Sequence, residues 1–199
     1  MKNILMVLLL ASMGLAAAVH ADTEIAVSST ATPSVGTIVF QLDGETSFPQ
    51  GQLGNTALQG WGPEISGGYR FPQNITLSLE TGYVGLGFKG NQFNTSWDMV
   101  PVLLKGQYNF SGGLIQPYVF LGAGLALNFQ SSSFAGTAYN SSEVDFLEEG
   151  GLGISFSVIE QIYLFIQTKI EIDNTSSHYA PDQPTILIPV DVGLVMSVN

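Results

Sequence analysis

The segment Trp97–Gln130 holds two stretches in which apolar residues alternate with polar or small ones, and this pattern restricts the segment to β-structure. In the first arm, one side carries Val100, Val102, Leu104, Tyr108 and Phe110, and the other carries Lys105, Gln107 and Asn109. In the second arm, Val119, Leu121, Ala123, Leu125, Leu127 and Phe129 alternate with Tyr118, Phe120, Gly122, Gly124, Ala126 and Asn128. A period of two places successive side chains on opposite faces of a strand. The intervening SGGLIQ supplies a turn, so the segment predicts a hairpin with one apolar face.

The first 21 residues have the layout of a cleavable secretory signal. Lys2 precedes the apolar run ILMVLLL, and smaller residues lead to Ala21. We expect cleavage after Ala21, a flexible lead over 22–33 and a single domain over 34–199. The mature chain then has four cationic side chains against sixteen carboxylates, a net charge of −12, with no basic cluster. This charge excludes nucleic acid as a partner.

The composition limits the environments in which the mature chain can fold. Charged residues are 11% of the chain, whereas a soluble domain carries roughly a quarter. Cysteine is absent, which excludes disulfides and thiolate metal sites. No run after the signal reaches the roughly 18 apolar residues of a membrane helix. If the chain crosses a bilayer, it must do so as a closed barrel, because open sheet edges leave unpaired backbone groups in hydrocarbon.

The remaining sequence completes a set of eight strand candidates. They are 35–42, 59–71, 75–88, the two arms of 97–130, 144–158, 162–172 and 186–198, with a bulge expected at Gly85–Gly87. Short links at 72–74, 111–115 and 159–161 alternate with long polar links at 43–58, 89–96, 130–143 and 173–184. This alternation is typical of bacterial transmembrane barrels, which have short periplasmic turns and longer outer loops. It places both chain ends in the periplasm.

The direction of the apolar face separates two kinds of up-and-down barrel. A lipocalin-like soluble barrel turns its apolar face inward around a ligand. Here the polar faces combine charges of both signs with many glycines, which suits an eight-stranded interior filled by side chains. We therefore predict an all-β fold, an eight-stranded antiparallel up-and-down transmembrane β-barrel. The predicted lumen charge network is Glu64, Arg70, Glu80, Lys105, Glu149, Lys169, Glu171 and Asp191.

Aromatic residues are expected in two girdles at the membrane interfaces. The periplasmic girdle is Tyr69, Phe71, Tyr108 and Phe110, and the outer girdle is Tyr83, Phe88, Trp97 and Phe129. Glu148 does not fit the pattern, because strict alternation points it toward lipid. It lies either at the outer headgroup level or at a bulge that turns it inward.

The central hairpin resembles the outer-membrane protein β-barrel domain family, in particular the eight-stranded OmpA-like and OmpX-like porin-type barrels. The motif residues are Pro101, Leu103, Leu104, Lys105, Tyr108 and Phe110, followed by Pro117, Tyr118, Gly122 and Gly124. The resemblance runs from Ser34 to the end. It implies a monomer in the outer membrane, with membrane lipid, lipopolysaccharide and the barrel-assembly machinery as partners. Such chains usually end in an aromatic residue, whereas this one ends Met-Ser-Val-Asn, with Val198 last on the lipid face.

Candidate chemistry is confined to the predicted outer loops. His178, the only histidine after the signal, follows Ser176 and Ser177. With Asp173 or Asp182 it could form a Ser/His/acid arrangement, but neighbouring residues in a polar loop lack the rigid placement that catalysis needs. The loop carboxylates Asp43, Glu45, Asp173 and Asp182 offer oxygen ligands for Ca²⁺ without the spacing of a calcium loop. We predict no catalytic residue, no cofactor and no metal ligand.

The sequence favours a non-enzymatic role in the envelope or in surface interaction, with a polar side-chain-filled lumen and exposed outer loops. One alternative is a narrow porin-like channel, gated by rearrangement of Glu80, Lys105, Glu149 and Lys169. The other is a lipid-modifying outer-membrane enzyme that uses His178. Conductance would favour the channel, and a His178-dependent turnover would favour the enzyme.

Overall fold

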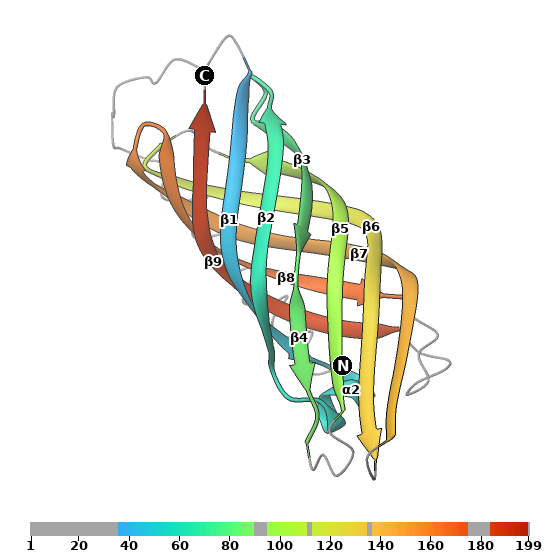
Figure 1. Cartoon of the computed structure of the whole chain (residues 1–199). Coiled ribbons are helices and arrows are strands. Elements are labelled where there is room, and N and C mark those ends of the chain that lie inside the picture. Colours follow the sequence, from blue (N-terminus) through green and yellow to red (C-terminus); the bar gives the residue numbers. More distant parts are fainter. Residues whose placement is uncertain (1–35, 90–94, 111–112, 135–136, 175–183, 199) are drawn as a thin grey trace. The chain divides into compact units, whose positions relative to one another are not determined.

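A single antiparallel sheet that closes on itself forms the structure, a computed structural model that describes residues 36–89, 95–110, 113–134, 137–174 and 184–198 (Figure 1). These residues lie in the compact unit Pro33–Asn199. The strands are β1 (Thr37–Pro49), β2 (Gly60–Arg70), β3 (Ile75–Gly82), β4 (Val84–Gly87), β5 (Ser96–Asn109), β6 (Ile115–Phe134), β7 (Thr137–Ile159), β8 (Ile162–Asp173) and β9 (Thr185–Val198). β1 pairs with both β2 and β9, which closes the ring. The predicted signal and lead, 1–33, fall outside the described residues.

β3 and β4 are two parts of one interrupted strand, so the ring has the eight strands that the sequence predicts. Both parts pair with β2 on one side and β5 on the other. The interruption falls at Tyr83, whose backbone N–H donates to the Pro63 carbonyl at 3.0 Å. Gly62 makes this close approach possible, because a Cβ there would lie 1.5 Å from the Tyr83 carbonyl oxygen. The bulge expected at Gly85–Gly87 is therefore displaced, and those glycines pair regularly with β5.

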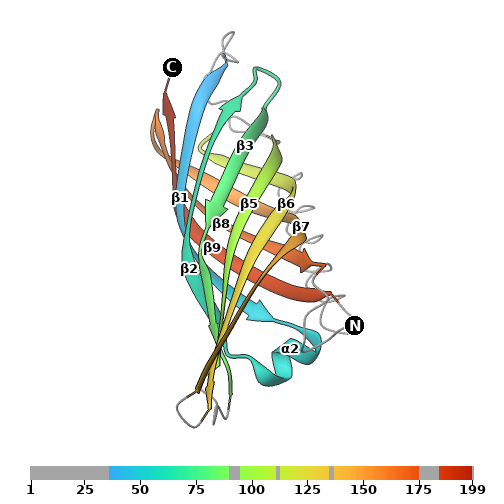
Figure 2. The same ribbon diagram turned by 45° about the vertical axis from the view of Figure 1, so that its right-hand side comes forward.

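The predicted outer loop 43–58 is largely regular structure, which corrects the sequence-based boundary. β1 continues to Pro49, and the short helix α2 (Gly51–Thr56) follows at this end of the barrel (Figure 2). Alternation persists through Asp43, Glu45 and Ser47, whose side chains are buried. These polar residues resemble a loop in composition, although they line the lumen. Of the helices in the described ranges, none has the length and apolarity to span a membrane.

The predicted loop 130–143 is also mostly strand. β6 and β7 pair as far as Phe134 opposite Thr137. β5 pairs with β6 only up to Ser131, and β7 first pairs with β8 at Leu147. Residues 132–134 and 137–139 thus form a two-stranded tip beyond β5 and β8. Residues 126–134 and 137–145 together are here called the β6–β7 arm. Within the described part of the chain, residues 137–145 pair with β6 alone.

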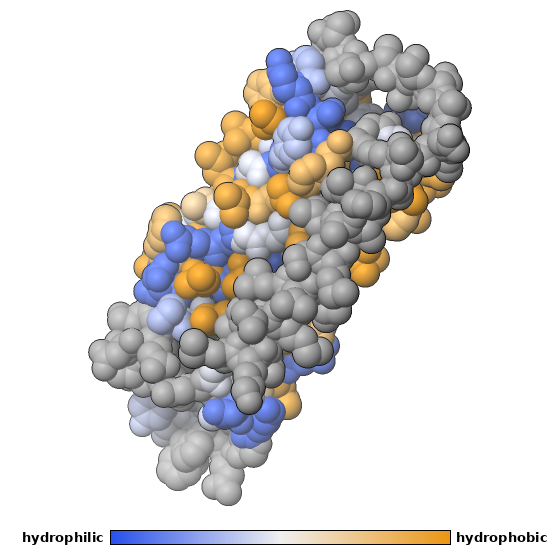
Figure 3. Space-filling view, turned by 180° about the vertical axis from the view of Figure 1, so that it is seen from behind, coloured by the Kyte–Doolittle hydropathy of each residue, from blue (hydrophilic) through white to orange (hydrophobic). Residues whose placement is uncertain are grey.

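The barrel turns its apolar face outward, as predicted. Ile65, Leu79, Leu104, Leu121 and Val192, from five different strands, are between 54% and 73% exposed. Hydrophobic residues accordingly occupy much of the visible barrel wall in Figure 3. This orientation is opposite to that of a soluble ligand-binding barrel. Glu148 also points outward from a regular stretch of β7, where it lies between Ala123 and Ile172.

The aromatic girdle is clearest at the end of the barrel where β1 begins and β9 ends, which the loop lengths predict to be periplasmic. The opposite end is called the outer end. Tyr69 packs edge-on against Phe71 with ring centroids 5.0 Å apart, and Tyr108 packs edge-on against Phe110 at 5.3 Å. At the outer end Tyr83 and Phe129 are exposed as predicted. Phe88 and Trp97 depart from the predicted girdle, because both pack against apolar residues inside the barrel.

Candidate functional site

Lys169 of β8 lies at the centre of a carboxylate cluster inside the lumen. Its Nζ is 2.8 Å from Glu64 Oε1, 3.0 Å from Glu171 Oε1 and 3.1 Å from Glu45 Oε2. Three more carboxylates surround it at 3.6 to 3.9 Å, those of Glu149, Glu80 and Asp191. The acids come from β1, β2, β3, β7, β8 and β9. One ammonium group therefore interacts with acids from six strands around the ring.

Lys105 of β5 is the second cation of this cluster. Its ammonium pairs with Glu80 and lies 5.1 Å from the centroid of the Phe120 ring. Glu80 also faces Lys169, so the two lysines share one carboxylate. Gly122 leaves room for the neighbouring acid, because a Cβ there would lie 2.6 Å from Glu149 Oε1. The small residues on the inner face thus make space for long charged ones.

Arg70 is placed apart from the other seven residues of the predicted network. It lies at the periplasmic end of β2, where its Nε donates to Thr76 Oγ1 at 3.4 Å. Its guanidinium carbon is 5.9 Å from the Tyr163 ring centroid. Among the described residues, no ion pair joins Arg70 to the cluster.

Two lumen acids, Asp43 and Glu45, are absent from the predicted network because they fall in the segment predicted as a loop. Both are strand residues of β1 and are buried. Asp173, the third carboxylate of the predicted loop set, is also buried and accepts a hydrogen bond from Asn128 Nδ2 at 2.8 Å. The period-two alternation of 37–49 was the signal that could have identified Asp43 and Glu45. His178 and Asp182 lie outside the described residues.

The outer end of the lumen is apolar, which corrects the prediction of a lumen that is polar throughout. The buried residues of this apolar cluster are Ala57, Val84, Leu86, Met99, Leu103, Ala126, Leu147 and Leu187. Leu53 of α2, together with Phe88 and Trp97, packs against it. Apolar side chains therefore occupy the lumen between the charged cluster and the outside.

Polar side chains connect the charged cluster with the periplasmic half. Gln41 Nε2 donates to Asp43 Oδ1 at 3.2 Å. Gln167 Nε2 donates to Asp191 Oδ2 at 2.7 Å, and its own carbonyl accepts a hydrogen bond from the Tyr118 hydroxyl at 3.0 Å. Asn109, Gln116 and Ser155 are also buried in this half. The lumen is thus asymmetric, with hydrogen-bonding groups on the periplasmic side of the charged cluster and mainly apolar groups on the outer side, where Asn128 and Asp173 form a buried polar pair.

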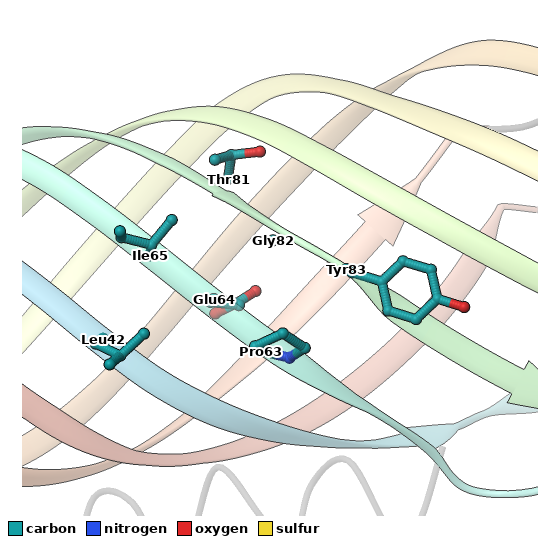
Figure 4. Close-up of a pocket in the computed structure, with 7 residues that line it drawn as sticks. All are labelled: Leu42, Pro63, Glu64, Ile65, Thr81, Gly82 and Tyr83. Atoms are coloured by element: carbon teal, nitrogen blue, oxygen red, sulfur yellow. The ribbon is translucent and has the colours of Figure 1, made fainter.

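Figure 4 shows a shallow depression in the barrel wall near the strand interruption. It is lined by Leu42, Pro63, Glu64, Ile65, Thr81, Gly82 and Tyr83. Glu64 is buried and belongs to the lumen cluster, and the exposed Leu42 and Ile65 belong to the apolar outer face. The titratable groups of the depression are therefore one lumen acid, Glu64, and the exposed phenol of Tyr83.

An eight-stranded antiparallel ring with an apolar outside and a charged inside defines an integral β-barrel of the outer membrane. The family comparison agrees: the chain belongs to the outer membrane protein beta-barrel domain family, whose model matches residues 7–195.

Solved structures of low sequence identity share this fold. Neisserial surface protein A is 17% identical with a TM-score of 0.55, and the match covers 82% of this chain and 99% of that one. A major outer membrane protein of Thermus thermophilus is 11% identical with a TM-score of 0.57, covering 81% and 99%. The outer membrane enzyme PagL is 13% identical with a TM-score of 0.55, covering 77% and 97%. None of the curated proteins compared with the sequence matches it.

Proposed function

We propose that this protein is a sealed structural barrel that contributes to the integrity of the outer membrane. The main support for the proposal is that two sets of side chains fill the lumen, the Lys169 cluster and the apolar cluster on its outer side. A narrow channel would require both fillings to be displaced. Breaking the ion pairs would leave buried charges without partners, and opening the outer end would expose packed apolar side chains to water.

The proposed role is non-catalytic. A catalytic group must reach its substrate, whereas the acids of the charged cluster are at most 6% exposed. Their side chains face the two lumen lysines and one another. A lipid-esterase activity of the purified protein that disappeared in a His178→Ala variant would contradict this part of the proposal.

Removal of the protein from its native cells tests the structural role. We expect cells without it to take up a large hydrophobic dye faster and to release periplasmic enzymes, and the full-length protein to restore the barrier. A variant with a shortened β6–β7 arm should restore it equally, because the barrel wall is intact. If loss of the protein left this barrier unchanged and slowed the uptake of small polar solutes, the channel alternative would replace the structural one.

A second candidate function, contact with an external surface, is supported by the β6–β7 arm. Among the described residues, those at 137–145 of its outer strand pair with β6 alone, and unpaired strand edges offer backbone groups to other molecules. The structures of similar fold include Neisserial surface protein A and Ail, the attachment invasion locus protein of Yersinia pestis. One structure of Ail is 14% identical with a TM-score of 0.51, and a second is 13% identical with a TM-score of 0.50.

The contact role is tested by shortening the arm, which removes only one pairing with β5, that of Ser131 with Ser96. Gln130 pairs with Ser141, so residues 131–140 can be replaced by an Asn-Gly turn at that pair. We expect the variant to insert into the outer membrane normally and its cells to adhere less to a surface that binds wild-type cells. Unchanged adhesion would contradict a contact role for the arm.

A further inference from the structure

We propose that the lumen binds one divalent metal ion of the Ca²⁺ or Mg²⁺ class through Asp43, Glu64 and Asp191. One carboxylate oxygen from each residue lies within 4.8 Å of the others. The three come from β1, β2 and β9, the strands at which the barrel closes. This site is independent of the envelope role proposed above.

The strand register places acids directly opposite one another. Asp43 of β1 is opposite Glu64 of β2, and Glu45 of β1 is opposite Asp191 of β9. A third such pair is formed by Glu149 and Glu171, on β7 and β8. Like charges at opposed positions of an antiparallel pair destabilise a sheet. Three such pairs in one lumen therefore demand a positive charge close by.

The two lumen lysines do not supply enough positive charge to balance these acids. The cluster contains seven carboxylates, the six around Lys169 and that of Asp43, against the ammonium groups of Lys105 and Lys169. Formal charges thus leave an excess of five negative charges. Protonation can remove part of this excess, and a bound metal ion removes two charges at one point.

The acids near Lys169 form two overlapping triads that share Glu64. The first, Glu45, Glu64 and Glu171, already surrounds the Lys169 ammonium at 2.8 to 3.1 Å. The second is the proposed metal site. In this second triad the Lys169 ammonium contacts the shared Glu64 at 2.8 Å and lies 3.9 Å from Asp191, and none of the described residues forms an ion pair with Asp43. A second cation placed there would complement the ammonium in the first triad.

Unsatisfied oxygens point to a ligand at the second triad. Within the described ranges, Asp43 Oδ2 and Asp191 Oδ1 have no hydrogen-bond partner, although the two residues are only 6% and 0% exposed. The other oxygen of each carboxylate is held by a glutamine, Gln41 for Asp43 and Gln167 for Asp191. Such outer hydrogen bonds orient metal-binding carboxylates. Hard divalent cations prefer oxygen ligands of this kind, completed by water.

Binding of ⁴⁵Ca²⁺ to the chelator-treated protein tests the proposal directly. The full mature chain is refolded in detergent without lipopolysaccharide, because lipopolysaccharide itself binds divalent cations. We expect one Ca²⁺ per barrel, in competition with Mg²⁺, and a higher unfolding temperature in Ca²⁺ than in chelator. Asp43→Asn and Asp191→Asn should each weaken binding by roughly tenfold or more.

Glu160→Gln is the matched control, because Glu160 is an exposed acid in the turn between β7 and β8. All three variants must retain the heat-dependent mobility of a folded barrel on a detergent gel. The proposal is overturned if the wild type binds no Ca²⁺ or Mg²⁺, which would mean that protons alone neutralise the excess acids. It is also overturned if Glu160→Gln weakens binding as much as the two aspartate variants do.

Discussion

Replacing Lys169 by methionine should strongly destabilise the barrel. The substitution keeps a long side chain but removes the ammonium that faces six carboxylates. Lys169 is 1% exposed, so water does not take over its role. Removing one partner of a buried ion pair costs about 3–5 kcal/mol, because the other charge is left buried and unpaired. With several carboxylates left together, we expect a loss at or above the upper end of this range.

Urea unfolding in lipid vesicles, followed by tryptophan fluorescence, measures this loss at neutral pH. Lys89→Met is the matched control, because Lys89 is an exposed lysine whose ammonium donates a hydrogen bond to the Gly54 carbonyl at 2.9 Å. We expect the control to change the free energy of unfolding by no more than about 1 kcal/mol. Adding Glu64→Gln to Lys169→Met should recover part of the loss, since it removes one of the unpaired charges. Equal urea midpoints for Lys169→Met and Lys89→Met would refute the reasoning.

Three further perturbations address other parts of the barrel. Gly124→Ala should lower the free energy of unfolding in urea by about 1–3 kcal/mol, because its Cβ would lie 2.0 Å from the Val102 carbonyl oxygen. Gly106→Ala is the control and should be nearly neutral, because a Cβ there has nothing within 4 Å. Equal effects of the two substitutions would contradict the close approach of β5 and β6. Leu147→Ala should lower the free energy of unfolding by about 2–5 kcal/mol, because it leaves a cavity in the outer apolar cluster. Leu121→Ala, on the lipid-facing side, should lower it clearly less. The reverse order would mean that the faces of β6 and β7 are misassigned. Tyr83→Phe, which removes the hydrogen bond to Asp98 Oδ1 at 2.6 Å, should lower the free energy of unfolding by about 0.5–1.5 kcal/mol, and a larger loss would indicate that the strand interruption depends on this bond.

The parts of the fold that were predictable from the sequence are those encoded by local alternation. In β8, Leu164 and Ile166 point outward while Gln167 and Lys169 point inward, a pattern that a period of two reveals without tertiary information. The placement of Glu64, Lys105 and Lys169 inside the barrel follows from the same rule. Their convergence on Lys169 does not, because it depends on strand stagger and on the reach of side chains across the lumen.

The missed features depend on tertiary contacts. In β5, the period of two that places Lys105 inside also places Leu103 inside, but it does not reveal that Leu103 packs with residues of other strands in one apolar cluster. Helix α2 contains two glycines and lacks a side-chain N-cap, so its sequence gives no helix signal. The β6–β7 arm is rich in Ser and Asn, as loops are, and its pairing is set by continuation of the β6–β7 register. Asp43 and Glu45 were missed for a related reason, since charged residues near a strand end resemble the start of a loop.

Conductance of the purified protein in a planar lipid bilayer tests the central claim, a lumen sealed by its own side chains. The account predicts that the wild type inserts without a steady ion current. Lys105→Ala, which leaves Glu80 without its closest cation, should produce transient openings if the charged cluster contributes to the seal. A steady single-channel current through the wild-type barrel would contradict the account.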